Sequence, residues 1–206
     1  MKVVIVLGGD APASVLMDWR FKAADFSIAA DSGMHACVAA GLEPDLLIGD
    51  MDSFVAKDGA PACETVRIDD QEQTDFQKAL SRPELQGADE VVVLGGTGGR
   101  SDHFLNNLLI AANLPLHASV VFDSDNEIIH RVTPGCPFAC QGMDGQTISL
   151  IPLGDCEGVR SKGFEWSLED ESMGVGKQLC QSNFAQADEI AVSLESGILY
   201  LVVLKH

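Results

Sequence analysis

The sequence has 206 residues, of which 46% are hydrophobic, and its 31 acidic and 13 basic residues give a formal net charge of −18 at pH 7. This length and hydrophobic share allow one large core or two small ones and exclude a disordered acidic chain. So acidic a surface repels nucleic acid and anionic membranes, and we expect neither as a partner.

The N-terminus carries a short apolar run, residues 3–7, that Gly8-Gly9-Asp10 closes. This run is shorter than a signal peptide requires and lacks a clear cleavage site, so we expect a buried first strand. No apolar run along the chain reaches membrane-spanning length. Of the six cysteines, only Cys136 and Cys140 are close in sequence, without the paired spacing of a zinc site. We therefore predict a cytoplasmic protein with reduced thiols.

The first part of the chain alternates apolar strands with helices. Continuous apolar strands separated by helices are typical of a parallel sheet covered on both faces, so we predict a doubly wound, mostly parallel, Rossmann-like α/β domain over residues 1–124. The expected strands are 3–7, 26–30, 46–48, 66–68, 90–94 and 118–122, and the expected helices are 14–22, 34–40, 75–80 and 104–110.

The pattern changes from about Asn126 onward, where glycines, prolines and short β-rich pieces dominate. The expected strands are 127–132, 147–150, 189–194 and 198–204, with Ser196-Gly197 as a hairpin turn between the last two. Residues 125–206 are therefore predicted to form a separate all-β domain.

Polar clusters follow four of the predicted strands. Loops at the carboxyl ends of parallel strands converge on one crevice, which is the usual ligand site of an open α/β sheet. A single such aspartate would more simply be a helix cap or a turn residue, but four clusters in succession favour a site. The clusters are Asp31–Gly33, Gly49–Ser53, Asp69–Asp75 and Gly95–His103.

Within these clusters, Asp50 and Asp52 form an Asp-x-Asp pair directly after a buried strand. Two carboxylates in such a place need a metal ion, hydrogen-bond donors or water, and hard cations prefer oxygen ligands. Lys78 follows Asp75 by one helical turn, so it could form a local ion pair or contact a phosphate.

The glycine-rich stretch 95–99 lets backbone amides approach phosphate, although it lacks the complete pattern of a Walker loop. Arg100 could clamp phosphate oxygens or lie free on the surface. Asp102 and His103 could act as a base and its partner, or Asp102 could cap the following helix. In so acidic a chain, a nucleotide also needs a divalent metal to offset the field.

These motifs, in this order and spacing, resemble those of the thiamine pyrophosphokinase family. The motifs are Asp31-Ser32-Gly33, Gly49–Ser53, Gln71 with Thr74–Phe76 and Lys78-Ala79, and Gly98–His103. In the second half, Gly163–Leu168 and Ser182-Asn183 resemble the family's thiamine-binding segments. The sequence departs from the family at Glu165, where a basic residue is common, and at Phe184, where an acidic one is.

The resemblance implies an N-terminal α/β domain that binds ATP and Mg²⁺ and a C-terminal β-sandwich that binds thiamine and mediates dimerisation. It implies a homodimer whose active sites join the two subunits, and transfer of pyrophosphate from ATP, the co-substrate, to the thiamine hydroxyl. The expected catalytic residues are Asp31, Asp50, Asp52 and Asp75, and the last three are the expected Mg²⁺ ligands. The expected ATP contacts are Gln71, Lys78, Arg100, Asp102 and His103, and the expected thiamine contacts are Trp166, Ser182 and Asn183.

Other interpretations remain open at this point. Trp166 could be a core aromatic of the β domain. The acceptor could be another alcohol, such as a hydroxymethylpterin, because the donor half would be identical. The protein could also bind a nucleotide without turnover, or be a metal-dependent phosphatase.

Overall fold

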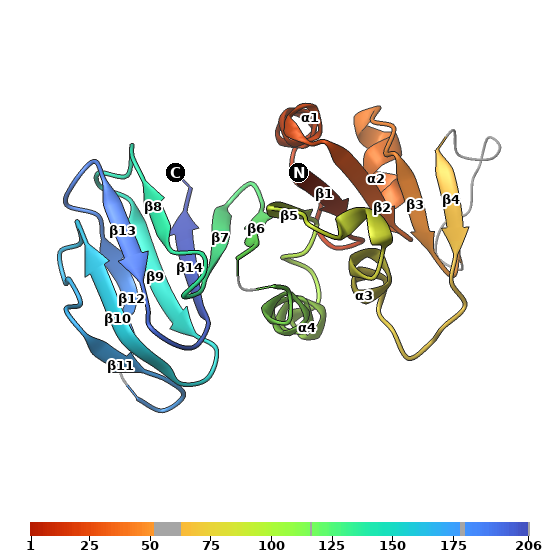
Figure 1. The fold of residues 1–206 in the computed structure, drawn as a ribbon. Helices are drawn as coiled ribbons and strands as arrows, with labels where there is room; N and C mark the ends of the chain where they lie inside the picture. The colour runs from red at the N-terminus through yellow and green to blue at the C-terminus, as the bar shows by residue number, and fades with distance from the viewer. Residues whose placement is uncertain (52–62, 116, 178–179, 206) are drawn as a thin grey trace. The chain divides into compact units, whose positions relative to one another are not determined.

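A computed structural model describes residues 1–51, 63–115, 117–177 and 180–205 (Figure 1). The chain divides into two compact units. The first comprises Met1–Asn113 and Phe122–Asp125, and the second comprises Leu114–Val121 and Asn126–His206. The strands of the chain belong to a large mixed sheet and a separate four-stranded antiparallel sheet. No helix among the described residues has the length and apolar character needed to cross a membrane.

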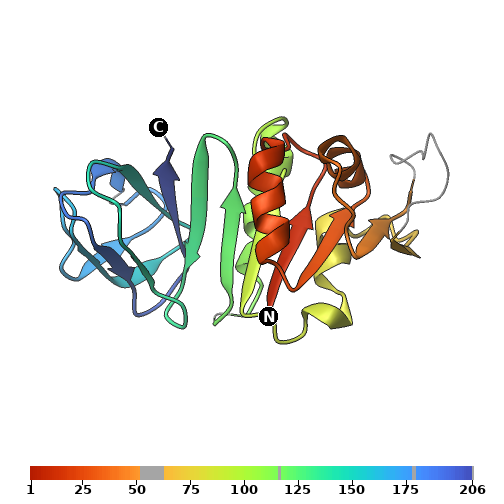
Figure 2. The same cartoon turned by 90° about the horizontal axis from the view of Figure 1, so that it is seen from above.

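The first unit is built on parallel strands in the order β5-β1-β2-β3-β4. The strands are β1 (Lys2–Val6), β2 (Phe26–Ala30), β3 (Leu46–Gly49), β4 (Glu64–Arg67) and β5 (Glu90–Leu94). The helices are α1 (Ser14–Ala23), α2 (Gly33–Ala40), α3 (Asp75–Leu80) and α4 (Ser101–Ala112), with a 3₁₀ turn at Pro83–Leu85. Figures 1 and 2 show α1 and α2 on one face of these strands and α3 and α4 on the other. The α/β interpretation is thus confirmed.

Strands β1, β2, β3 and β5 are buried almost without interruption, as strands covered on both faces should be. The chain leaves β1 in one direction through β2, β3 and β4, and then returns to place β5 on the other side of β1. The carboxyl ends of β1 and β5 therefore flank the point where the strand order reverses, which is where open α/β sheets bind ligands.

Helix α3 shows how local sequence places a site residue. Thr74 caps it, with the Gln77 backbone N–H donating to Thr74 Oγ1 at 3.2 Å and the Thr74 backbone N–H donating to Gln77 Oε1 at 3.0 Å. This reciprocal pair fixes the first helical residue, Asp75, at the start of the helix. Helix α4 begins earlier than predicted, so Ser101, Asp102 and His103 lie in its first turn.

The second unit contains antiparallel strands, in the order β12-β9-β14-β7 in the large sheet and β11-β10-β13-β8 in the separate sheet. Side chains from both sets share one core, which includes Ile148, Val159, Ile190 and Leu201. The strands are β7 (Glu127–Val132), β8 (Phe138–Cys140), β9 (Thr147–Pro152), β10 (Cys156–Lys162), β11 (Glu171–Met173), β12 (Cys180–Phe184), β13 (Ile190–Ser193) and β14 (Leu199–Leu204). The residues of β6 (Ser119–Asp123) are divided between the two units.

Candidate active site

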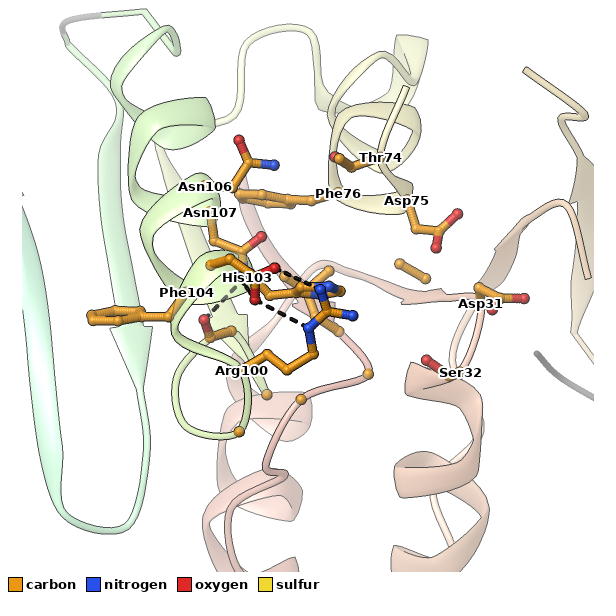
Figure 3. A pocket seen from close by; sticks show the side chains of 18 of the residues that line it. Asp31, Ser32, Thr74, Asp75, Phe76, Arg100, His103, Phe104, Asn106 and Asn107 are labelled. Atoms are coloured by element: carbon orange, nitrogen blue, oxygen red, sulfur yellow. Dashed lines mark hydrogen bonds and ion pairs between the residues drawn. The ribbon is translucent and has the colours of Figure 1, made fainter. Parts of the chain in front are cut away.

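A cavity of about 1110 Å³ opens in the first unit at the carboxyl ends of its strands (Figure 3). It is lined by the loops after β1, β2, β3 and β5 and by the first turns of α3 and α4. Eight residues that the sequence predicts for the donor site line this one cavity: Asp31, Asp50, Gln71, Asp75, Lys78, Arg100, Asp102 and His103. Asp52, the ninth, lies outside the described residues.

Two glycine-containing loops meet where the strand order reverses. The Gly9 backbone N–H donates to Gly95 O at 3.0 Å, and the Gly99 backbone N–H donates to Asp10 Oδ2 at 2.9 Å. A Cβ on Gly98 would lie 2.4 Å from Asp10 Oδ2, so only glycine permits this approach. The two loops form a backbone cradle of the kind that receives phosphate groups.

Sequence reasoning used Gly8-Gly9-Asp10 only to end the first strand and missed its place in the site. The signal was available, because this is a fifth polar cluster that directly follows a buried strand. Asn107 was also missed; from α4 it donates through Nδ2 to Gly96 O at 3.0 Å and so holds the second loop. Asp10 and Asn107 both line the cavity.

Asp31 is the most deeply buried of the predicted carboxylates, with 2% of its surface exposed. Its Oδ1 has no hydrogen-bond partner among the described residues, which is costly for a buried carboxylate oxygen. Gly49 permits its position, because a Cβ there would lie 2.8 Å from Asp31 Cβ. An unpartnered oxygen in a cavity wall suits a group that arrives with the substrates.

Backbone strain in the described part of the chain coincides with the predicted motifs. The non-glycine residues with positive φ there are Asp31 at 43°, Met51 at 65° and Ser182 at 55°. Such conformations are unfavourable for L-residues and tend to persist at functional sites. Each of the three lies within a segment that the sequence singled out, and Met51 directly follows Asp50.

Lys78 lines the cavity between two carboxylates. Its side chain is 3% exposed, and Nζ lies 3.2 Å from Asp75 Oδ1 and 4.0 Å from Asp50 Oδ2. Gln71 donates through Nε2 to the same Asp50 oxygen at 2.8 Å. The predicted local ion pair of Lys78 with Asp75 is therefore confirmed. Burial raises the pKa of Asp75 and Lys78 opposes that rise.

The donor set is chemically suited to a hard divalent cation, since Asp31, Asp50 and Asp75 offer carboxylate oxygens in one cavity and Asp31 Oδ1 lacks a partner among the described residues. Among those residues, no three acidic, histidine or cysteine side chains gather closely enough to form a metal site by themselves. The remaining ligands would have to come from the substrate, from water or from Asp52.

Arg100, which Figure 3 labels, forms a two-bond ion pair with Asp102 in the cavity lining, and both side chains are largely exposed. Nε lies 3.1 Å from Asp102 Oδ1, and Nη2 lies 2.5 Å from Oδ2. This pairing lowers the pKa of Asp102. The His103 backbone N–H donates to Asp102 Oδ1 at 3.1 Å, the same oxygen that accepts from Arg100 Nε.

The predicted acceptor residues belong to the second unit. Trp166 is 57% exposed, so the alternative that it is a core aromatic is wrong. Asn183, by contrast, is 1% exposed, and its amide is used within the chain. The Ser182 backbone N–H donates to Ser149 Oγ at 2.9 Å.

Comparison with known proteins identifies two family models along the chain. Residues 18–121 match the model for the thiamin pyrophosphokinase catalytic domain, and residues 138–199 match that for the thiamin pyrophosphokinase vitamin B1 binding domain. The chain is 27% identical over 183 residues to thiamine pyrophosphokinase of Bacillus subtilis (strain 168), covering 85% of each sequence. It is also 27% identical over 181 residues to thiamine pyrophosphokinase 2 of Oryza sativa subsp. japonica, covering 79% of this chain and 66% of the relative.

Solved structures agree with this result. The crystal structure of thiamine pyrophosphokinase from Bacillus subtilis superposes with a TM-score of 0.83 at 25% identity, over 100% of this chain and 99% of that one. The structure of thiamin pyrophosphokinase from Geobacillus thermodenitrificans has a TM-score of 0.81 at 24% identity, over 100% and 98%, and shares the fold. Because the catalytic-domain model alone spans more than half of the sequence, this chain belongs to the thiamine pyrophosphokinase family.

Proposed function

We propose that this protein transfers the pyrophosphoryl group of ATP to the hydroxyl of thiamine, releasing thiamine diphosphate and AMP. The observation that carries the proposal is that the glycine cradle and a set of carboxylates line one and the same cavity, in a chain that belongs to this family. A Rossmann-like first domain would bind the donor and a β-sandwich second domain would bind the acceptor.

The donor half follows from the cradle. Backbone amides of the loops after β1 and β5 can donate to phosphate oxygens, and the exposed Arg100 guanidinium can reach a phosphate at the cavity mouth. Lys78 is buried beside Asp50, and the exposed Gln71 donates to the same carboxylate. We therefore assign the triphosphate to a path from the cavity mouth to the carboxylates.

The transfer breaks one phosphorus–oxygen bond and forms another. The thiamine hydroxyl oxygen attacks the β-phosphorus, the bond from that phosphorus to the α–β bridging oxygen breaks, and AMP leaves with that oxygen. Asp31 Oδ1, buried and unpartnered among the described residues, is suited to accept a hydrogen bond from the attacking hydroxyl. Asp50 and Asp75, with Asp52, would hold Mg²⁺, which neutralises phosphate charge when bound. Lys78 adds a fixed positive charge beside them.

The direct test is to incubate the protein with ATP, Mg²⁺ and thiamine and identify the products by mass. Thiamine diphosphate and AMP in equal amounts would support the proposal. Phosphate release without an acceptor would indicate a phosphatase. If a hydroxymethylpterin outcompetes thiamine, the acceptor is the pterin alcohol and not thiamine. Nucleotide binding without any product would contradict an enzymatic role.

Arg100→Ala should raise the KM for ATP about tenfold and leave the KM for thiamine nearly unchanged. The guanidinium is expected to meet phosphate, and its loss removes a charge-assisted contact to the donor alone. Steady-state kinetics with each substrate varied measures both constants. Arg160→Ala, which removes another exposed arginine paired with Asp170, is the matched control. An increase in the KM for thiamine alone would contradict the assignment of Arg100 to the donor.

We further propose a cytoplasmic homodimer in which each active site draws on both subunits. An Asp75→Asn subunit and a Trp166→Ala subunit, inactive or weakened alone, should then restore a fraction of wild-type activity when they are folded together. Activity of the isolated mixed dimer is the measurement. No recovery in a confirmed mixed dimer would place each site within one chain.

A further inference from the structure

Asn183 fixes the main chain of Trp166 from both sides. The Trp166 backbone N–H donates to Asn183 Oδ1 at 3.2 Å, and Asn183 Nδ2 donates to Trp166 O at 2.8 Å. Nδ2 also donates to Cys180 Sγ at 3.3 Å, while Oδ1 accepts the Phe184 backbone N–H at 2.8 Å. The amide is thus engaged at each polar atom, and at 1% exposure it has no surface to offer a ligand.

This arrangement revises the role that the sequence suggested for Asn183. An amide whose donors and acceptor are satisfied inside the chain would gain little from a new hydrogen bond to an aminopyrimidine. Its contacts instead hold two neighbouring main-chain segments, those of Trp166 and Phe184. The Glu165 backbone N–H adds a bond to Phe184 O at 2.9 Å and ties the same segments together.

The side chains carried by these two segments form an aromatic pair. The ring centroids of Trp166 and Phe184 lie 6.4 Å apart with an interplanar angle of 53°. Trp166 is 57% exposed and Phe184 is 42% exposed, so a rigidly held main chain presents both rings outward. Exposed aromatic rings on an ordered backbone are suited to bind a flat ligand, because little conformational entropy is lost.

The chemistry around the pair favours a cationic ring. The electron-rich faces of indole and phenyl attract cations, and the residue before Trp166 in the chain, Glu165, is exposed and acidic. The thiazolium of thiamine is flat and carries a permanent positive charge. The strained Ser182, held by its backbone bond to Ser149, begins the short segment Ser182–Phe184 that brings Phe184 to Trp166.

We propose that Phe184 is a specificity-determining residue for the acceptor, completing with Trp166 a two-ring surface for a flat cationic ring, and that Asn183 is the positioning residue that holds both. This inference rests on the proposed function for the identity of the acceptor. It assigns no ligand contact to the Asn183 amide.

The test uses intrinsic fluorescence, because the chain has two tryptophans, Trp19 and Trp166. In a Trp19→Phe background, Trp166 is the remaining tryptophan, and thiamine binding without ATP is followed by its quenching. Phe184→Leu keeps an apolar side chain but removes the ring, and should raise the dissociation constant of thiamine about tenfold. Phe184→Tyr should restore affinity to within about twofold of wild type. The KM for ATP should not change.

Phe138→Leu is the matched control, since Phe138 is a phenylalanine of the same unit whose ring pairs with His130, at 4.7 Å, instead of Trp166. Thiamine affinity that is unaffected by Phe184→Leu, or equally reduced by Phe138→Leu, would overturn the inference. Either result alongside wild-type product formation would leave the proposed function standing. If the wild-type protein binds thiamine with quenching but forms no product, the proposed function is wrong while the inference about Phe184 still stands.

Asn183→Asp tests the positioning role, because it keeps the acceptor oxygen but removes the donors to Trp166 O and Cys180 Sγ. We expect a shift of the ligand-free Trp166 emission, together with a higher KM for thiamine at little-changed kcat. Unchanged emission with a higher KM would show a direct ligand contact and contradict the positioning role. The Phe184 variants keep the inference testable if Asn183 variants do not fold.

Discussion

Asp75→Asn should lower kcat by about a hundredfold or more with the fold intact. Asp75 is the first residue of α3, held there by the Thr74 cap, and its carboxylate lies 3.2 Å from Lys78. Replacing it with an amide keeps the size and the cap but removes the charge that a metal-bound triphosphate would need. Steady-state kinetics gives the loss, and circular dichroism and thermal unfolding report on the fold.

The control for this substitution is Asp69→Asn, in the same acidic stretch. Asp69 pairs with Arg67 on the surface and is not part of the cavity lining. Asp69→Asn should change kcat by less than about twofold, as expected for an exposed ion pair.

The metal role proposed for Asp75 also predicts loss of activity in excess EDTA. Full activity in EDTA, or wild-type turnover by Asp75→Asn, would contradict the role of Asp75 in holding a metal ion.

The first unit was predictable because its strands are unusually uniform. Buried runs such as Val3–Val6 and Val91–Leu94 are continuously apolar. They show neither the period of a helix nor the alternation of a half-exposed strand, so they indicate a strand covered on both faces. Once those strands were placed, the convergence of the polar loops after them followed from the geometry of parallel sheets. The sequence could not show which loops touch, because the β5-β1 contact depends on strand order and not on local pattern.

The second unit was predictable only in part. The long strands β7 and β14 pair along six residues each and carry clear apolar runs, and both were predicted. The strands β8, β10, β11 and β12 were missed. The predicted hairpin at Ser196-Gly197 is wrong, because β13 and β14 on either side of it belong to different sheets. Three-residue strands such as Glu171–Met173 are too short to show a period, and the pairings of β10 with β11 and of β12 with β9 contain register shifts that break alternation.

The candidate site shows a similar division. Residues named by motif and strand end, such as Asp31 and Lys78, line the cavity. Burial was the property that sequence could not supply. Asn183 and Trp166 were both expected to contact thiamine, yet Asn183 is 1% exposed and Trp166 is 57% exposed. This difference in exposure is the reason that we propose different roles for the two residues.

Lys78→Met should lower both stability and turnover, and the two losses should respond differently to metal. The ammonium is 3% exposed and lies between Asp75 and Asp50, so its removal leaves two neighbouring carboxylates without their cation. We expect a loss of about 2 kcal/mol in the free energy of unfolding, below the cost of breaking a fully buried pair because Asp75 is 39% exposed. Turnover should fall about a hundredfold.

Added Mg²⁺ should restore most of the stability of Lys78→Met, because a bound cation neutralises the same carboxylates. It should not restore turnover, because the metal cannot also supply the fixed ammonium that we expect beside the phosphates. Thermal unfolding and kinetics across a Mg²⁺ series measure the two effects separately. The control is Lys22→Met, which removes an exposed lysine from its pair with Asp18 and should change neither. Recovery of wild-type turnover in Mg²⁺ would show that Lys78 only balances the carboxylates and takes no part in holding the triphosphate.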